Sequence, residues 1–271
     1  MTPENNIAED VLRPTTGPGG RGVGGLAVSG MTAFTMVDFP GKLACVVWFQ
    51  GCNLKCQYCY NAGLIPRSPG RVDLKEVLLF LLARYKQLDG VVFSGGECLE
   101  QPFDGLVELA QYAKRLGMAV KIDTNGTHPE EVKRLVLEGV VDYVSLDIKA
   151  SGVSRYMEVA GAAPGDWKKT LETVGVLVDL DRAGAKWEPR TTLFPGMVDY
   201  GDIAGICGVL RGAGFAGAYH VQGWRDRSDM TKPAPKDDAR LIHEWASAAK
   251  LPFAVGFRNF APSLDTIPAS A

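Results

Sequence analysis

The chain has 271 residues, with 29 basic and 31 acidic side chains and a net charge of −2 at pH 7. This balance excludes the strongly basic surface that would favour nucleic acid or an anionic membrane. The apolar runs are too short to span a bilayer and no start resembles a signal peptide, so we expect a soluble cytoplasmic protein with no nucleic-acid or membrane partner. The length suits one domain of the size of a (β/α) barrel.

The first 24 residues are rich in glycine and proline, which interrupt every apolar pattern. We therefore expect residues 1–24 to be a flexible N-terminal extension. A single domain is predicted over residues 25–260, followed by a C-terminal tail over 261–271. Its first part holds a short strand or hairpin at 26–34, a turn at 38–41 and a buried strand at 43–49, which leads directly into a cluster of cysteines.

After the cysteines the chain alternates between strand and helix patterns. Helices are predicted over 72–86, 102–116, 127–138, 167–182, 203–211 and 235–249. Strands are predicted over 90–93, 118–123, 142–147, 187–193 and 218–222, with a last short strand at 253–257. Alternation of this kind predicts parallel strands joined by right-handed crossovers. About six βα units are fewer than the eight of a closed barrel, so the expected fold is α/β, a partial (β/α)6 TIM-like barrel that stays open.

Three cysteines, Cys52, Cys56 and Cys59, follow the first predicted buried strand with the spacing C-x3-C-x2-C. Thiolates favour iron–sulfur clusters, zinc or copper(I). A structural zinc site would need a fourth cysteine or histidine, and the three histidines of the chain form no suitable pair. Disulfides fit poorly because the number is odd, and chance packing of apolar cysteines is the remaining alternative. A [4Fe–4S] cluster held by three cysteines would leave one iron open to a substrate, and this is the interpretation we favour.

The other polar clusters fall where the predicted strands end, and in a parallel barrel these ends share one rim. Taken singly, each cluster could be an ordinary turn or an exposed ion pair. Taken together, they predict a site for a ligand with an amino group, a carboxylate and a ribose. Glycines let a backbone approach a ligand closely, Glu97 could accept from an ammonium, Lys149 could bind a carboxylate, and Asp123 and Asp147 could hold hydroxyls or a hard cation. The candidate rim residues are Gly95, Gly96, Glu97, Asp123, Thr124, Asn125, Asp147, Lys149, Arg190 and Gln222.

The cysteine motif, with Tyr58 before its last cysteine and Gly95-Gly96-Glu97 further on, resembles that of radical S-adenosylmethionine (SAM) enzymes. A wider set of motifs over about residues 25–225 resembles the glycyl-radical-enzyme activases, in particular the anaerobic ribonucleoside-triphosphate reductase activating proteins. These motifs are Gly25-Leu26, Asp38-Phe39-Pro40-Gly41-Lys42, Gln50-Gly51-Cys52-Asn53, Asp123-Thr124-Asn125-Gly126, Asp142-Tyr143, Asp147-Ile148-Lys149, Arg190-Thr191-Thr192 and Pro195-Gly196.

The resemblance implies roles for these residues. The three cysteines would hold a [4Fe–4S] cluster, and the amino and carboxylate groups of SAM would bind its fourth iron. Tyr58 would lie against the adenine, largely through its backbone, and Gly95, Gly96 and Glu97 would receive the methionine amino group. The other implied contacts are Asp147 and Lys149 with polar groups of SAM, Asp123, Thr124 and Asp147 with a monovalent cation, and Arg190 and Gln222 on the rim.

The resemblance also implies a reaction. An electron from a low-potential donor such as flavodoxin or ferredoxin would enter the cluster and cleave SAM to a 5′-deoxyadenosyl radical. This radical would generate a glycyl radical on a partner enzyme, with anaerobic ribonucleoside-triphosphate reductase as the expected partner. Cofactor and cluster would supply the chemistry, and the protein would orient them and exclude water.

Some residues depart from the activase pattern and leave the partner open. Tyr60 stands where many activases have histidine, and Cys98 follows Gly-Gly-Glu where proline is frequent; we interpret Cys98 as a packed thiol. One alternative is a radical SAM enzyme that acts on a small molecule or peptide, because function depends on the site rather than on the fold. The other is a non-catalytic zinc or electron-transfer protein.

Overall fold

A computed structural model describes residues 25–224, 237–260 and 266–270. Its eight strands follow one another in the sheet in chain order, from β1 to β8. The β1–β2 pair is antiparallel, and the pairs β2–β3, β3–β4, β6–β7 and β7–β8 are parallel. The predicted α/β fold with a mostly parallel sheet is therefore confirmed. The prediction for residues 1–24 lies outside the described residues.

The chain forms two compact units. Of the described residues, unit 1 comprises 25–53, 61–124 and 133–144, and unit 2 comprises 54–60, 125–132 and those from 145 onward. Helix α4 (Pro129–Leu137) and strand β5 (Tyr143–Asp147) contribute residues to both. The assignment of residues 25–260 to a single domain stays a prediction, and each unit is described on its own below.

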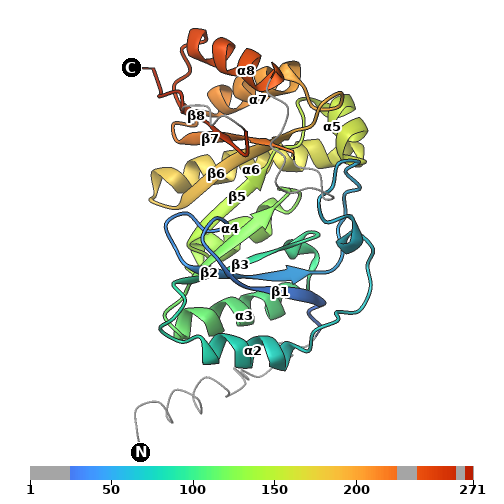
Figure 1. Cartoon of the computed structure of the whole chain (residues 1–271), viewed down its shortest axis with the longest axis vertical. Coiled ribbons are helices and arrows are strands. Elements are labelled where there is room, and N and C mark those ends of the chain that lie inside the picture. Colours follow the sequence, from blue (N-terminus) through green and yellow to red (C-terminus); the bar gives the residue numbers. More distant parts are fainter. Residues whose placement is uncertain (1–24, 225–236, 261–265, 271) are drawn as a thin grey trace, which may run out of the picture. The chain divides into compact units, whose positions relative to one another are not determined.

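Unit 1 contains β1 (Val28–Thr35), β2 (Ala44–Phe49), β3 (Gly90–Gly95) and β4 (Ala119–Thr124). Its helices are α2 (Leu74–Ala83) and α3 (Phe103–Arg115), with the short 3-10 turns η1 (Ala62–Leu64) and η2 (Cys98–Glu100). Helices α2 and α3 lie side by side (Figure 1), joined by a hydrogen bond of 2.9 Å from the Tyr112 hydroxyl to the Leu78 carbonyl.

The core of unit 1 includes a small apolar cluster at the start of its parallel strands. Phe39, from the turn that precedes β2, packs on Ala44, Val46 and Val92, and its ring lies 5.9 Å from that of Tyr143. Burial of such side chains is the main favourable contribution to folding. The other face of β2 is also buried, which explains why its sequence is a continuous apolar run rather than an alternation.

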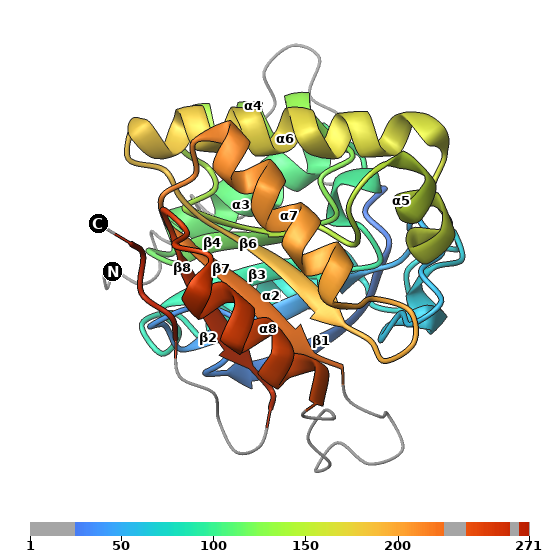
Figure 2. The same cartoon turned by 90° about the horizontal axis from the view of Figure 1, so that it is seen from above.

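Unit 2 contains the end of β5 with β6 (Lys186–Leu193), β7 (Ala218–Gly223) and β8 (Ala254–Arg258). Its helices are α5 (Val153–Ala160), α6 (Pro164–Arg182), α7 (Tyr200–Ala213) and α8 (Asp237–Ala248). Helices α7 and α8 pack together beside β7 (Figure 2). Within the described part of the C-terminal tail, Ile267 forms an antiparallel bridge with Val255 of β8.

The strands of unit 2 alternate between apolar and polar residues. Leu146, Leu193, Tyr219 and Val221 are buried apolar side chains. Because successive side chains of a strand point to opposite faces, the intervening residues share the other face. These residues are Ser145, Asp147, Glu188, Arg190, Thr192, His220 and Gln222. One face of this sheet is thus lined with polar and charged groups.

The predicted strands and helices closely match the observed ones. Helix α5 was not predicted. The last strand was predicted at 253–257, but its parallel pairing with β7, which extends the sheet beyond the six βα units, was not. Across the described residues, no helix combines the length and the apolar character needed to cross a membrane.

Candidate functional site

The main chain that leads to Cys52 is held within unit 1 by Gln50, directly after β2. Gln50 is 3% exposed, and its amide nitrogen donates to the carbonyls of Gly63 and Pro66 at 3.2 and 2.6 Å. The backbone continues this contact, since the Cys52 nitrogen donates to the Ile65 carbonyl at 3.1 Å. Gln50 was missing from the predicted site. The available signal was a polar residue directly after an apolar strand and two positions before the first cysteine.

Gly95 and Gly96 end β3 against the same stretch of backbone. A Cβ on Gly95 would lie 2.3 Å from the Phe49 carbonyl oxygen, and one on Gly96 would lie 2.2 Å from that of Gly51. Gly95 also has a φ of +125°, which L side chains rarely adopt. The nitrogens of Gly96 and Glu97 donate to the carbonyls of Phe49 and Gly51 at 3.0 and 2.9 Å. The two glycines therefore allow β3 to approach the start of the cysteine loop more closely than any other residue would.

Glu97 is buried and connects the ends of β3 and β4. Its Oε1 accepts from the Leu99 nitrogen at 3.1 Å and from the Thr124 hydroxyl at 2.9 Å. Both predicted residues are thus brought together within unit 1, with Glu97 as the N-cap of η2. The predicted contact of Glu97 with a ligand ammonium stays a prediction.

Cys98 is a packed thiol beside these residues. Its Sγ donates to the Asp123 carbonyl at 3.5 Å, and burial, followed by the neighbouring Glu97, raises the pKa of the thiol well above its usual value. The Asp123 carboxylate forms an ion pair with Lys121, whose side chain is fully buried. The carboxylate of Asp123 is therefore held in place at the end of β4.

Cys56 and Cys59 lie in unit 2, on a loop whose turn is closed by a 3.1 Å hydrogen bond from the Cys59 nitrogen to the Cys56 carbonyl. Tyr58, between them, is buried and stacks on Phe194, with ring centroids 5.7 Å apart and planes 19° apart. Phe194 in turn contacts Trp224 edge to face at 4.9 Å. The ring of Tyr58 is therefore occupied by protein contacts on this side, which fits a role through its backbone.

Asp147 ends β5 between two cations. Lys149 Nζ lies 3.1 Å from one of its carboxylate oxygens, and Arg190 Nε lies 3.0 Å from the other. Burial alone would raise the pKa of Asp147, but the attraction of Arg190 and Lys149 outweighs it and lowers the pKa to about 2. Burial also disfavours the charge of Lys149, yet the Asp147 carboxylate keeps the pKa of Lys149 well above its usual value. Three of the predicted rim residues thus form one fully charged group with a surplus positive charge.

Two other predicted residues lie in unit 2 with different surroundings. The side-chain oxygen of Asn125 accepts from the nitrogen and hydroxyl of Thr127 at 3.0 and 2.7 Å, a local turn contact that shapes the chain before α4. Gln222 is half-buried near the end of β7 and lies in register with Thr192 of β6 and Arg258 of β8.

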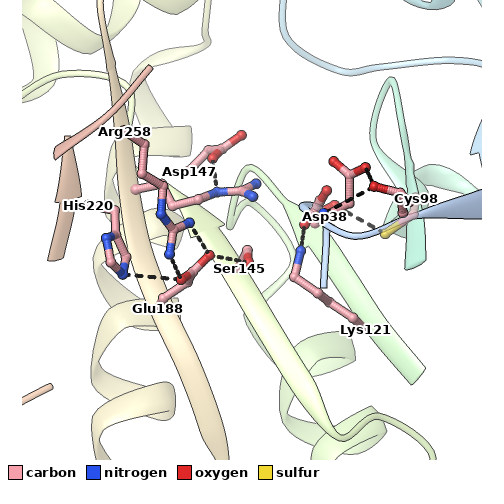
Figure 3. A network of polar contacts seen from close by, with 11 residues as sticks. Asp38, Cys98, Lys121, Ser145, Asp147, Glu188, His220 and Arg258 are labelled. Carbon is pink, nitrogen blue, oxygen red and sulfur yellow. Dashed lines mark hydrogen bonds and ion pairs between the residues drawn. The ribbon is translucent and has the colours of Figure 1, made fainter. Parts of the chain in front are cut away.

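A second charged group on the polar face of unit 2 was not predicted from the sequence. The Glu188 carboxylate of β6 accepts hydrogen bonds from both terminal nitrogens of Arg258, at 3.0 and 2.8 Å, and from the Ser145 hydroxyl at 3.0 Å (Figure 3). His220 Nε2 lies 3.3 Å from the same carboxylate. Residues of four strands therefore converge on one buried carboxylate, a pattern that only the sheet register creates.

The donor set suits a soft metal centre. All six cysteines are free thiols, and three of them fall within the eight residues from Cys52 to Cys59. Across the described residues, no three Cys, His, Asp or Glu side chains are gathered as they would be around a single ion. Cys52 belongs to unit 1 and the other two cysteines to unit 2. The assignment of Cys52, Cys56 and Cys59 as ligands therefore stays a prediction that rests on their chemistry and spacing.

Comparison with known proteins gives a consistent result. The family described as the radical SAM superfamily matches residues 46–198. A protein of Methanocaldococcus jannaschii, provisionally named glycyl-radical enzyme activating enzyme MJ1227, is 34% identical over 232 residues, which cover 82% of this chain and 91% of the relative. The pyruvate formate-lyase-activating enzyme of Clostridium pasteurianum is 35% identical over 151 residues, 53% of this chain and 62% of the relative. The crystal structure of QueE from Escherichia coli shares the fold, with a TM-score of 0.51, 16% identity and coverage of 85% of this chain and 93% of QueE.

Proposed function

Since this chain belongs to the radical SAM superfamily, among its glycyl-radical enzyme activating members, we propose that it generates a glycyl radical on anaerobic ribonucleoside-triphosphate reductase. Its cofactors are a [4Fe–4S] cluster and SAM. The single observation that carries the proposal is the similarity to the M. jannaschii activating enzyme over 91% of that protein's length. The more specific choice of a reductase as the partner rests on the motifs of residues 25–225 quoted above.

In this proposal Cys52, Cys56 and Cys59 bind the cluster. When bound, the cluster and SAM supply a one-electron reductive cleavage that gives a 5′-deoxyadenosyl radical. Gly95 and Gly96 present their backbone to the amino group of SAM, and their lack of a side chain lets the end of β3 lie directly against the backbone of Phe49 and Gly51. The half-buried Lys149, fixed by Asp147, offers a positive charge for a carboxylate.

Other residues act by orienting these groups. Arg190 holds the second oxygen of Asp147, so the carboxylate keeps one orientation relative to Lys149. Glu97 and Thr124 fix the ends of β3 and β4 against each other. Preorganised charges of this kind need no rearrangement when a ligand binds. The proposal also includes Asp123 and Thr124, with Asp147, as ligands for a monovalent cation, and Tyr58 and Gln222 as contacts of SAM.

The test uses full-length protein reconstituted anaerobically with iron and sulfide. Iron and sulfide are counted, and 5′-deoxyadenosine is measured after the addition of SAM with flavodoxin, ferredoxin or dithionite as the electron source. Purified anaerobic ribonucleoside-triphosphate reductase and pyruvate formate-lyase are then offered in parallel, and electron paramagnetic resonance (EPR) detects a glycyl radical. We expect four irons per chain, 5′-deoxyadenosine, and a glycyl radical on the reductase that requires both SAM and reductant.

Three outcomes would change this proposal. A glycyl radical on pyruvate formate-lyase alone would replace the partner and keep the activase. Formation of 5′-deoxyadenosine without a radical on either enzyme, but with consumption of a small molecule or peptide, would favour the alternative class of substrate. Colourless protein that holds zinc would refute radical chemistry altogether.

A further inference from the structure

The segment of residues 54–60 carries Cys56 and Cys59 but contains no helix or strand. Its main chain is fixed from outside by the end of α5. The Lys55 nitrogen donates to the Ala160 carbonyl at 2.8 Å, and the Gln57 side chain reaches the Glu158 carbonyl at 3.4 Å. The last turn of α5 thus holds the loop close to Cys56 through two of its carbonyl groups.

The residue that ends α5 makes the approach especially close. Gly161 has a φ of +57°, and a Cβ at this position would lie 3.0 Å from both the Cβ and the carbonyl oxygen of Lys55. A glycine in the left-handed conformation commonly ends a helix. Here the absence of a Cβ also allows the end of the helix to lie directly against Lys55. Any shift of α5 would therefore be transmitted directly to the cysteine segment.

Helix α5 is itself fixed by Arg155, one turn before its end. The guanidinium Nε lies 3.3 and 3.1 Å from the two carboxylate oxygens of Asp202, and Nη2 lies 3.1 Å from one of them. Nη1 donates to Glu158 at 2.8 Å, and Nη2 also donates to the Met197 carbonyl. Asp202 is 3% exposed and lies in the first turn of α7. One arginine thus ties α5 both to α7 and to the loop that precedes α7.

That loop starts at Phe194, the residue on which Tyr58 stacks. The contacts therefore form a closed ring within unit 2. It runs from Tyr58 to Phe194, through Met197 to Arg155, along α5 to Ala160, and back to Lys55. The cysteine segment is held on either side of Cys56: α5 binds Lys55, and the loop that starts at Phe194 contacts Tyr58. Arg155 joins α5 to that loop. A buried ion pair adds little to stability by itself, so its role in geometry is the more informative property.

We propose that Arg155 is a positioning residue for the cysteine segment: by fixing α5 to Asp202 and Met197, it sets the backbone position of Lys55 and thus the spacing of Cys56 and Cys59. Ligands of a metal centre must be held within about 0.5 Å of their productive positions by the residues around them. Contacts beyond the ligands commonly supply this constraint. The link to the cluster rests on the proposed function, in which these two cysteines are ligands, whereas the anchoring of the loop does not.

The first test measures hydrogen–deuterium exchange in the metal-free, full-length protein. Arg155→Met should make the Lys55 amide and the peptide of residues 54–60 exchange faster, by about tenfold, because the local opening becomes easier. Arg182→Met is the matched control, since it removes an exposed arginine that pairs with Asp179 at 3.0 Å in the same unit. Arg182→Met should leave the exchange rate of residues 54–60 unchanged. As an internal control, Arg155→Met should leave the exchange rate of the β7 peptide unchanged. Unchanged exchange of residues 54–60 in a folded Arg155→Met protein would overturn the proposal.

A second variant guards against misfolding of the first, because Arg155→Met leaves a buried carboxylate without its cation. Gly161→Ala places a methyl group against Lys55 without touching Asp202, and it should raise the exchange of residues 54–60 in the same way. Arg155→Lys should restore only part of the protection, since an ammonium lacks the planar fork that reaches Asp202, Glu158 and Met197 together.

The second measurement is the EPR spectrum of the reconstituted, reduced protein. A broadened or split cluster signal in Arg155→Met and Gly161→Ala, with a wild-type signal in Arg182→Met, is expected if the loop positions the ligands. Faster exchange with an unchanged EPR signal and unchanged iron content would overturn the positioning role. A wild-type protein that binds no iron would refute the proposed function instead, and the exchange comparison would still decide whether Arg155 anchors the segment.

Discussion

Arg258, at the end of β8, binds the buried carboxylate of Glu188 through both of its terminal nitrogens, at 3.0 and 2.8 Å. Glu188 is 3% exposed, whereas about a third of the Arg258 side chain is exposed. The pair joins β6 to β8, two strands that are not neighbours in the sheet. It therefore closes unit 2 across β7, and its removal should have a measurable cost.

Arg258→Met should lower the free energy of unfolding by about 2 kcal/mol, less than for a fully buried pair, because Ser145 and His220 still contact the carboxylate. Arg240→Met is the control, since Arg240 lies 4.0 Å from Glu244 with both side chains exposed, and such pairs contribute less than about 1 kcal/mol. Urea unfolding followed by circular dichroism measures both. Equal effects of the two variants would show that the Glu188 pair is not a structural tie.

Acid should destabilise the fold through His220 and Glu188. Burial, followed by Arg258, lowers the pKa of His220 from 6.5 to about 4, so the folded protein binds this proton less readily than the unfolded chain. Burial alone would raise the pKa of Glu188, but Arg258, Arg190 and His220 lower it from 4.5 to about 2. The stability that comes from keeping His220 neutral is fully present above pH 6.5 and is lost as the pH falls to 4. The stability that comes from the ionised Glu188 is lost as the pH falls from 4.5 to 2.

His220→Gln separates these two contributions. Between pH 6.5 and 4 the unfolding free energy of the wild type should fall by about 2–3 kcal/mol more than that of the variant. Urea midpoints at pH 7, 5.5 and 4.5 provide the comparison. Parallel curves for the two proteins over this range would count against a buried, neutral His220.

Gly96→Ala should displace the start of the cysteine loop, because the new Cβ would lie 2.2 Å from the Gly51 carbonyl oxygen, a backbone atom that cannot turn away. We expect at least about a tenfold loss of SAM affinity by equilibrium dialysis, as for loss of a well-placed contact. Gly208→Ala is the control. A Cβ there meets nothing within 4 Å in the middle of α7, so it should be neutral or stabilising by about 0.5–1 kcal/mol. Normal SAM binding by Gly96→Ala would exclude the proposed role of the Gly95–Gly96 backbone in SAM binding.

Replacement of any one of Cys52, Cys56 and Cys59 by serine should abolish the four-iron content and the brown absorbance, since a cubane cluster needs its thiolate ligands. Cys207→Ala is the matched control. The Cys207 thiol is buried in α7, where burial raises its pKa to about 12, so it is a neutral core side chain. Iron analysis after anaerobic reconstitution distinguishes the variants. Retention of four irons by two or more of the serine variants would disprove the ligand assignment.

The chain order of strands and helices was predictable because the signals for it are local. The apolar run of β2, the helical spacing of α3 and the glycine that follows it are each contained within a short stretch of sequence. The candidate site residues at strand ends were predictable for the same reason, since each follows its own strand directly. Helix α5 was missed because it has only eight residues and lies between Gly152 and Gly161, which are typical of turns.

The sequence by itself thus determined the cysteine spacing, the βα alternation and the polar residues that follow each strand, because all of these are properties of neighbouring residues. Only the tertiary structure decided which distant side chains meet. Ser145 lies 43 residues from Glu188, Arg258 lies 70 residues from it, and Arg155 lies 47 residues from Asp202. Such pairs are created by the register of strands and the packing of helices, which depend on the burial of the whole apolar core rather than on any one segment.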